Sequence, residues 1–194
     1  MEERSLRDLA LAPEEARMLR GFTFLSAKPQ ILVLNLDEGQ KGAADAPGGE
    51  ALLRDAAAAG IRVLSLYGRL EMDLADLSPE EAAEFTEGLD ITEPGRERLI
   101  AGAYGLLGLI SFFTCGPDEV RAWTLREGAT AVDAAGTIHS DLARGFIRAQ
   151  VVAYDDYAAH GFAFPACREA GCLRLEGKDY RVADGDVIEI RFNV

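Results

Sequence analysis

The sequence predicts an α/β segment followed by a smaller α+β domain. Two aliphatic runs, Ile31–Leu36 and Arg62–Leu66, flank a helical stretch, Ala51–Ala59, that Gly60 closes. Such continuous runs are typical of strands buried on both faces of a parallel sheet, so strand, helix and strand predict a right-handed parallel crossover. From Ser111 onward the apolar residues fall in short alternating runs, which indicates a second sheet of a different kind.

Start signals and apolar spacing indicate the helices of the first segment. Pro13, with two glutamates after it, predicts a helix start within a helical lead-in. Ser78, followed by proline and two glutamates, predicts another start and a helix through about Phe85. Arg96–Leu109 has one apolar helical face, which we expect to pack on the sheet. The glycine-rich stretch Gly39–Gly49 predicts a loop.

In the second segment the expected strands are FFTC, VRAWTL, FIRAQVV, LRLE and VIEIRFNV, the last after an Ala183–Asp186 turn. Helices are expected at Ala134–Ala143 and Tyr154–His160. These elements predict a small α+β domain from Ser111 to Val194.

Composition excludes several classes of protein. The longest nearly uncharged stretch, Ala101–Phe113, is too short to cross the roughly 30 Å core of a bilayer as a helix. The first residues carry mixed charges without the apolar segment of a secretion signal, so we expect a cytoplasmic chain. Cys115, Cys167 and Cys172 are an odd set without CxxC spacing. They fit neither a disulfide framework nor a zinc site, and are predicted to be reduced structural thiols.

The acidic balance argues against a broad nucleic-acid interface. The 194 residues include 33 acidic and 20 basic side chains, giving a formal charge of −13. Phosphate binding is expected to require a basic face, which this balance opposes. Since the acidic excess is smaller after Ile110, any RNA contact should be local and in the later half.

No catalytic or metal-binding set is predicted from the motifs. The string GCLRLEGKD, Gly171–Asp179, is one residue too long for a GxxxxGK[ST] phosphate loop and ends in Asp instead of Ser or Thr. His139 and His160 adjoin no serine or cysteine nucleophile, so we expect structural or hydrogen-bonding roles. Four aspartates are predicted to be helix-start and turn residues rather than acid–base pairs: Asp155, Asp156, Asp184 and Asp186.

A sharper signal follows the first predicted strand. Asn35-Leu36-Asp37-Glu38 comes where base-recognition loops of α/β nucleotide-binding sheets lie, at a strand's carboxyl end. The Asn35 amide can donate to and accept from a base edge, and the Glu38 carboxylate can accept. Ser65 lies at the corresponding end of the next strand. On spacing alone, a plain strand-end loop is the favoured interpretation.

Long strings of the sequence together resemble the YchF family of Obg-related P-loop nucleotide hydrolases, also called Obg-like ATPases. They are KPQILVLNLDE, LSLYGRLEMDLADL, FFTCGPDEVRAWTLREG, AAGTIHSDLARGFIRAQVV and LRLEGKDYRVADGDVIEIRFNV, spread over almost the entire chain. The resemblance implies that residues 1–24 end a helical insertion and that 25–110 are the last strands and helices of a P-loop-type parallel sheet. Residues 111–194 resemble a TGS domain, a β-grasp module shared with threonyl-tRNA synthetases and stringent-response synthetases.

The resemblance also implies nucleotide-binding residues. Asn35 and Leu36 would contact the base, and Glu38 goes with the family's preference for ATP over GTP. Ser65, Leu66 and Tyr67 fall in a second base-contacting loop that is usually Ser-Ala, a pattern from which Leu66 and Tyr67 depart. ATP or GTP is the expected cofactor, with weak or absent binding here, and Mg²⁺ is expected only in an intact family protein.

The family's phosphate loop, magnesium ligands and switch segments would lie upstream of Met1. Because these parts carry out phosphoryl transfer, we expect no nucleotide hydrolysis by this chain alone. It would be either a truncated piece or a naturally shortened relative. The strand Ile31–Leu36 would then expose an apolar edge, which predicts a homodimer or a covering segment.

Three functional hypotheses remain open. A binding module would dock on the ribosome or structured RNA, with Trp123 available for stacking. A nucleotide-hydrolase part would contribute base recognition only, and a regulator would bind proteins through the β-grasp surface. For the first, the alternative is scattered surface charge with Trp123 in the core. The candidate RNA-binding residues are Arg121, Arg126, His139, Arg144, Arg148, Lys178 and Arg181.

Overall fold

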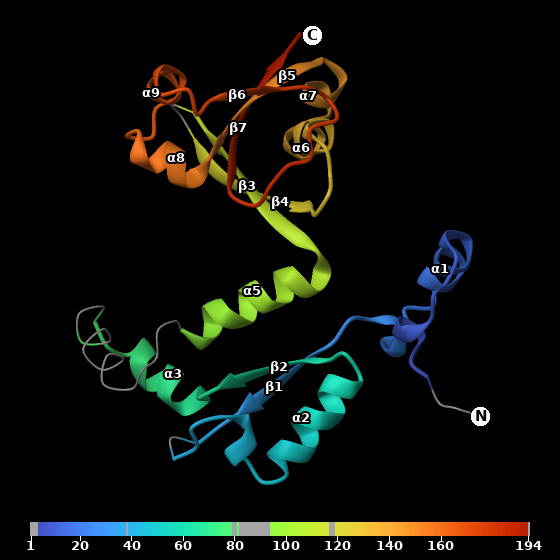
Figure 1. Ribbon diagram of the computed structural model, residues 1–194. Helices are drawn as coiled ribbons and strands as arrows, with labels where there is room; N and C mark the ends of the chain where they lie inside the picture. The colour runs from blue at the N-terminus through green and yellow to red at the C-terminus, as the bar shows by residue number, and fades with distance from the viewer. Residues whose placement is uncertain (1–3, 38, 79–80, 82–93, 117–118, 194) are drawn as a thin grey trace. The chain divides into compact units, whose positions relative to one another are not determined.

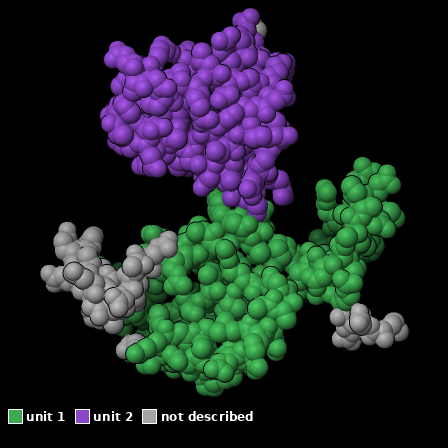
Figure 2. Space-filling view, in the orientation of Figure 1, with its two compact units in different colours: residues 1–107 green, residues 108–194 purple. Residues whose placement is uncertain are grey.

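The computed structural model describes residues 4–37, 39–78, 81, 94–116 and 119–193 (Figure 1). The chain divides into two compact units, Met1–Leu107 and Gly108–Val194, coloured separately in Figure 2. The first unit contains a two-stranded parallel sheet and the second a five-stranded mixed sheet. Over the described ranges, every helix is too short or too polar to span a membrane.

The predicted parallel crossover is present in the first unit. Strands β1 (Ile31–Asn35) and β2 (Arg62–Leu66) pair in parallel and are connected through α2 (Gly49–Ala58). The prediction that β1 is buried on both faces is wrong, because none of its residues is fully buried and Val33 is 40% exposed. Among the described residues one strand, β2, flanks β1, so its apolar run lacks there the neighbours on both sides that bury a central strand.

Helix α5 (Gly95–Leu107) packs on this sheet, as its apolar face predicted. A Cβ at Gly102 would lie 3.0 Å from Leu64 Cδ1, so the missing side chain permits the close approach. The helix does not continue to Leu109. Gly108 has a φ of +59°, a left-handed conformation that ends the helix, and the next strand begins at Leu109.

The other elements of the first unit are short. Ser78 begins a capping box, as predicted: its N–H donates to Glu81 Oε2 at 3.0 Å and its Oγ accepts from Glu81 N–H at 3.3 Å. The rest of that predicted helix, through Phe85, lies outside the described residues. A helix after β2 was not predicted. The elements are η1 (Leu6–Asp8), α1 (Pro13–Arg20), η2 (Leu25–Ala27), η3 (Ala43–Asp45) and α3 (Gly68–Ala75).

The second unit contains the five predicted strands in the order β4-β3-β7-β5-β6. Strands β3 and β7 are parallel at the centre, and the other neighbours are antiparallel. The strands are β3 (Leu109–Cys115), β4 (Val120–Arg126), β5 (Phe146–Ala153), β6 (Arg174–Glu176) and β7 (Asp186–Phe192).

Helices cover both faces of this sheet (Figure 1). Helices α6 (Ala131–Ile138) and α7 (Ser140–Arg144) pack on a core that includes Phe112, Val151 and Ile188. Helices α8 (Tyr154–Ala159) and α9 (Phe164–Glu169) pack on a second core. Strands β5 and β7 each contribute adjacent residues to opposite cores, since Val151 and Ile188 belong to the first and Val152 and Val187 to the second.

The predicted helix Ala134–Ala143 is wrong in one respect, because it is two helices. His139 is extended, with φ −164° and ψ 143°, and separates α6 from α7. Its Nδ1 accepts a hydrogen bond from Asp141 N–H at 3.2 Å, so the histidine caps α7. Helix α9 was not predicted.

Candidate functional site

The residues expected to contact a nucleotide base lie at the carboxyl ends of β1 and β2. Asn35 is exposed, and its Oδ1 accepts a hydrogen bond from Gly68 N–H at 2.8 Å. A Cβ at Gly68 would also lie 2.8 Å from Oδ1, so glycine permits this approach. The bond connects the end of β1 to the start of α3. With its oxygen engaged, Asn35 has its NH2 group to donate to a base acceptor.

The loop after β1 is held against the loop after β2. Tyr67 Oη–H donates to the Gln40 carbonyl at 2.8 Å, and Asp37 N–H donates to Gln40 Oε1 at 2.7 Å. Leu36 is 4% exposed, so its backbone rather than its side chain can face a ligand. Glu38 lies outside the described residues.

The remaining two predicted base contacts pack within the fold. Ser65 is half-buried opposite Leu34 in the sheet. The Leu66 side chain lies where α5 begins, since a Cβ at Gly95 would be 2.6 Å from Leu66 Cδ2. The structure therefore brings Asn35, Leu36 and the Ser65–Tyr67 stretch to one edge, where the Leu66 side chain packs against the start of α5 and the Tyr67 hydroxyl holds the two loops together.

Among the predicted RNA contacts, Arg121 lies over Trp123. The Arg121 guanidinium carbon is 4.1 Å from the ring centroid, and an Arg121 nitrogen is 3.8 Å from Glu119. Trp123 is half-buried, stacks on Phe112 at 6.5 Å and donates from Nε1 to Thr114 Oγ1 at 2.9 Å. The indole is therefore part of the packing of the second unit.

His139 and Arg144 both lie next to Asp141. Arg144 lies 3.1 Å from an Asp141 oxygen, whereas His139 Nδ1 accepts from the Asp141 N–H and forms no ion pair with the carboxylate through that nitrogen. The Arg144 and Asp141 side chains are substantially exposed to solvent, so their pair contributes little to stability. Arg144 is followed by Gly145 and strand β5, which carries the exposed Arg148.

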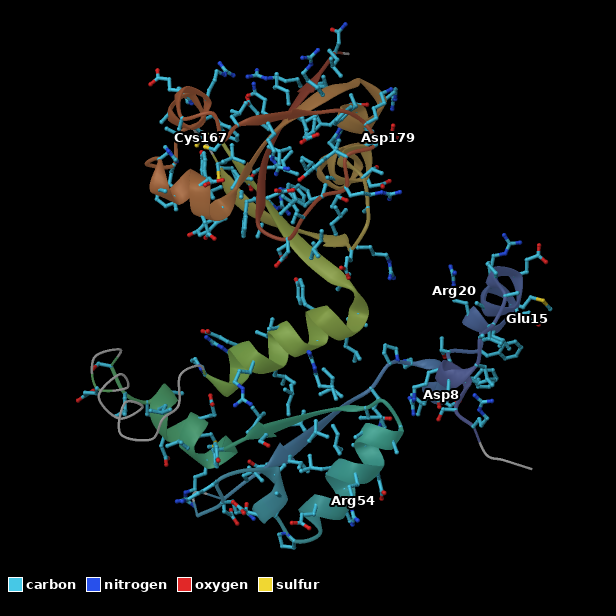
Figure 3. All side chains as sticks on the ribbon, in the orientation of Figure 1. Asp8, Glu15, Arg20, Arg54, Cys167 and Asp179 are labelled. Carbon is cyan, nitrogen blue, oxygen red and sulfur yellow. The ribbon has the colours of Figure 1, made fainter. Side chains whose placement is uncertain are left out.

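The other basic candidates lie elsewhere on the unit. Arg121 pairs with Thr114 and Arg126 with Leu109, so these arginines are five residues, about 17 Å, apart along β4. Arg181 donates to the Gly128 carbonyl. Lys178 is exposed beside Asp179, which is labelled in Figure 3. The predicted basic residues thus occupy several places rather than one continuous patch.

A groove in the second unit contains two arginines that the sequence did not single out. Its volume is about 650 Å³, and Arg168 of α9 and Arg191 of β7 line it. Strand β3 pairs with β7 at Phe113 and Val187, and the groove involves the end of β3 and the later residues of β7. Arg168 was missed because α9 was not predicted. Arg191 could have been found from the alternation of β7.

The aspartates near β7 are structural, as predicted. Asp186 is 2% exposed and accepts from Tyr180 Oη–H at 2.8 Å, Ala183 N–H at 2.9 Å and Arg174 at 3.1 Å. Burial, together with the hydrogen bond to Asp186, raises the pKa of Tyr180. Asp184 accepts from Ser111 N–H at 2.7 Å.

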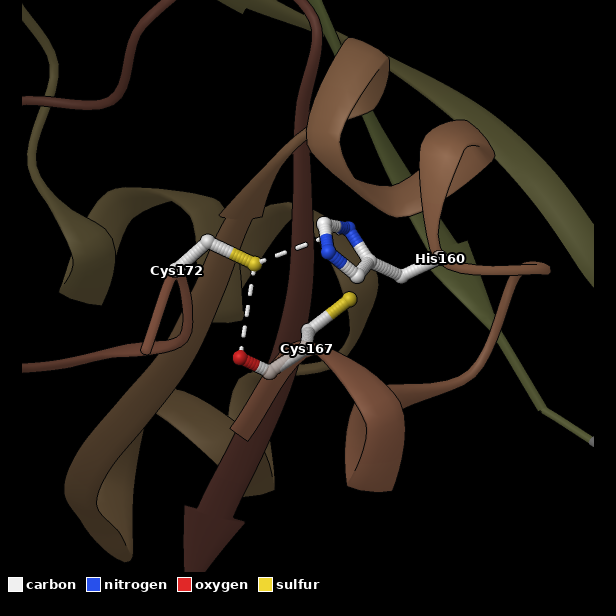
Figure 4. Close-up of side chains that lie close together, drawn as sticks. All are labelled: His160, Cys167 and Cys172. Atoms are coloured by element: carbon white, nitrogen blue, oxygen red, sulfur yellow. Dashed lines mark hydrogen bonds between the residues drawn. The ribbon is translucent and has the colours of Figure 1, made fainter. Parts of the chain in front are cut away.

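The structure also groups three residues that sequence spacing left apart. His160, Cys167 and Cys172 offer ligand atoms that all lie within 4.8 Å of one another (Figure 4). Cys167 is fully buried between α9 and the sheet, and the three cysteines are free thiols. The sequence signal that could have found this group is Gly171. A glycine between the two cysteines can end a helix there and turn the chain back, which brings Cys172 toward Cys167.

Comparisons with known proteins identify the family to which this chain is similar. The family model YchF-GTPase_C, described as a protein of unknown function (DUF933), matches residues 109–193. The "Ribosome-binding ATPase YchF" of Bacillus subtilis (strain 168) is 43% identical, over 99% of this chain and 52% of that protein. The protein of the same name from Escherichia coli O157:H7 is 42% identical, over 97% of this chain and 51% of its own length.

Solved structures agree with these relatives. The Schizosaccharomyces pombe YchF GTPase matches 97% of this chain and 50% of its own, with a TM-score of 0.82 and 29% identity. A GTP-binding protein from Pyrococcus horikoshii OT3 shares the fold, with a TM-score of 0.59 over 87% of this chain and 47% of its own, at 18% identity. The chain belongs to the YchF family and is homologous to the C-terminal half of its proteins. It spans about half the length of the curated relatives it matches.

Proposed function

We propose that this chain is the carboxyl-terminal part of a YchF-type nucleotide-binding and ribosome-associated protein. Residues 1–24 end a helical insertion, 25–110 complete a P-loop-type nucleotide domain, and 111–194 form a TGS-like β-grasp domain. The observation that carries the proposal is similarity to proteins named ribosome-binding ATPases over 97–99% of the chain. The unit begins with the β3–β4 hairpin, continues with helix α6 and ends with β7, which pairs in parallel with β3 at the centre of the sheet. This arrangement supports the β-grasp assignment.

The first unit contributes base recognition without hydrolysis of its own. Asn35, fixed by Gly68, presents an amide donor at the edge where the two loops meet. The sequence contains no GxxxxGK[ST] string to cradle phosphates, so we expect at best about millimolar affinity for ATP or GTP. Mg²⁺ would be bound only in an intact family protein.

Isothermal titration of the chain with ATP, GTP and ADP tests this assignment. We expect weak binding that is similar for ATP and ADP, because base contacts are common to both. Asn35→Ala should abolish it, whereas Gln30→Ala, at the other end of β1, should not. Micromolar affinity, or binding that survives Asn35→Ala, would contradict the proposal.

The second unit contributes docking on the ribosome or on structured RNA. Arg144 and Arg148 are exposed, lie on either side of Gly145 and are four residues apart in sequence. Arg148 belongs to β5, where the pairing with β7 is irregular between Phe146 and Arg148. Arginines in such positions can contact phosphates without a broad basic face.

Co-sedimentation with purified ribosomes at low and moderate salt tests the docking. We expect pelleting that weakens as salt rises, because phosphate contacts release counterions. The variant Arg144→Glu/Arg148→Glu should lower binding by about tenfold or more. Arg20→Glu/Arg54→Glu changes net charge equally in the first unit and should bind like the parent chain (Figure 3). Equal loss in both variants would remove Arg144 and Arg148 from the proposal.

A protein partner is the second candidate, and the groove beside β7 favours it. Phe164, Ile188 and Phe192 give the groove an apolar lining between its arginines. Absence of pelleting at low salt would support this candidate over RNA. A hydrolase whose catalytic part is supplied from outside these residues also agrees with the relatives' name. A homodimer through the β1 edge would appear as doubled mass in light scattering, and Val33→Lys should abolish it.

A further inference from the structure

Two helix ends in the second unit place three metal-ligating side chains together. Helix α9 ends with Gly171 at a φ of +79°. The Cys172 N–H donates to the Cys167 carbonyl at 3.0 Å, and the Gly171 N–H donates to the Arg168 carbonyl at 3.2 Å. These two bonds define a Schellman motif, in which the side chains at the two ends of the longer bond come into contact. Here those side chains are Cys167 and Cys172.

Helix α8 ends in the same way. Gly161 has a φ of +68°, and Phe162 N–H donates to the Tyr157 carbonyl at 2.8 Å. The motif places the Phe162 ring on Tyr157, 5.8 Å between centroids, and leaves His160 as the C-cap residue directly after the helix. His160 Nδ1 lies 4.0 Å from Cys172 Sγ (Figure 4). The two helix ends thus bring one imidazole to two thiols.

The histidine is held as metal-binding histidines are held. His160 Nδ1 is 2.7 Å from the Asp156 carbonyl, which can only accept, so Nδ1 carries the proton. That tautomer leaves the lone pair on Nε2, the nitrogen then free to coordinate a metal. Histidines that bind metals usually donate their other ring N–H to a carbonyl or carboxylate. The bond from His160 Nδ1 to the Asp156 carbonyl involves neither cysteine, so it is a second observation that is independent of the contact between the two thiols.

From these contacts we propose that His160, Cys167 and Cys172 bind a thiophilic divalent cation, with Zn²⁺ as the cation of best fit. Tetrahedral zinc with sulfur at about 2.3 Å and nitrogen at about 2.0 Å separates its ligand atoms by roughly 3.5 Å. One ligand atom from each residue, counting either ring nitrogen of His160, lies within 4.8 Å of the others, so side-chain movements that turn Nε2 toward the two thiols complete the site. Water takes the fourth position.

Charge and burial agree with this choice of ion. Cys167 is fully buried, whereas His160 and Cys172 are half-buried, so the ion can enter from their side. Two thiolates neutralise the divalent charge, which removes the penalty of an unpaired charge near the apolar core of Val152 and Val187. Binding releases two thiol protons to solvent, so affinity falls steeply as pH decreases.

Titration of the reduced full chain with Co²⁺, followed by displacement with Zn²⁺, tests the site. We expect one equivalent of Co²⁺, a thiolate-to-cobalt charge-transfer band and intense tetrahedral d–d bands, all removed by Zn²⁺. Cys172→Ser and His160→Asn should each weaken binding by about 100-fold. Cys115→Ser is the matched control, because Cys115 packs against the same core but is not one of the three ligands.

Thermal unfolding provides a second measurement. Zn²⁺ should raise the Tm of the parent chain and of Cys115→Ser, with reversal by a chelator, but should not raise that of His160→Asn. His160 is only half-buried, so this variant keeps the test valid even if a cysteine variant folds poorly. Absence of the charge-transfer band in the reduced parent chain would overturn the proposal. So would an equal loss of binding in Cys115→Ser.

Discussion

The two units use similar apolar runs with different results. In the first, β1 has no fully buried residue, and Val33 is 40% exposed. In the second, Val151 and Val152 on β5 are both fully buried, because helices cover both faces of a five-stranded sheet. Burial of an aliphatic strand is therefore decided by what flanks it, since an isolated pair of strands is marginally stable in water.

Hydrogen exchange should show the largest difference between the units. Strands β5 and β7 each lie between two paired neighbours, whereas in the part of the chain that the structure describes β1 and β2 pair with each other alone. We expect the central amides of β5 to exchange at least about 100-fold more slowly than those of β1. Mass spectrometry of exchanged peptides from the whole chain measures this. Equal protection of β1 and β5 would contradict this expectation and would show that β1 is protected by contacts beyond its pairing with β2.

Loss of the Asp186 carboxylate should have the next largest effect. Asp186→Ala leaves the Tyr180 hydroxyl and the Ala183 N–H without their acceptor and removes one of the two acidic partners of Arg174, so we expect the free energy of unfolding to fall by about 2–4 kcal/mol. Urea unfolding of the second-unit signal measures it. Asp179→Ala, the control, removes an exposed carboxylate that precedes Asp186 in the sequence. It should change the free energy of unfolding by less than about 0.5 kcal/mol.

A pair of identical substitutions compares the two kinds of strand directly. Val152→Ala removes fully buried methyl groups and should lower the free energy of unfolding by about 2 kcal/mol. Val33→Ala removes methyl groups that are already partly hydrated, so its effect should be below about 0.5 kcal/mol. Urea midpoints of the two variants test this. Similar losses would mean that Val33 is covered in solution, as a β1-edge dimer would require.

The smallest expected effect concerns the start of α6. Thr130 N–H donates to Asp133 at 2.7 Å, and hydrogen bonds from Thr130 lower the pKa of Asp133. A lowered carboxyl pKa stabilises the fold above the ordinary value of 3.8 and ceases to do so as pH falls through the folded value. Asp133→Asn should therefore lower the free energy of unfolding by about 1 kcal/mol at neutral pH and by little at low pH.

Urea midpoints of the parent chain and Asp133→Asn across the acid range test this pH dependence. Asp155→Asn, in the first turn of α8, is the control for removing an exposed helix-start charge. A difference between parent and Asp133→Asn that stays constant down to the lowest pH would contradict the capping explanation.

The sequence by itself determined the strands, most of the helices and the loops that lie at one edge of the first sheet. Local signals suffice for these: the apolar period, the helix starts at Pro13 and Ser78, and the glycine at the end of α2. The same signals predicted Asn35 at a strand end, because the residue directly follows an aliphatic run. The long strings shared with the YchF family carried the rest of the assignment.

Only the tertiary structure decided which residues meet. It divided one predicted helix at His139 and left β1 half-exposed. It also brought His160 to the two cysteines beside it, across a short helix that the sequence did not predict. Sequence spacing fixes contacts within one turn or strand, whereas these outcomes depend on how separate elements pack against a shared sheet.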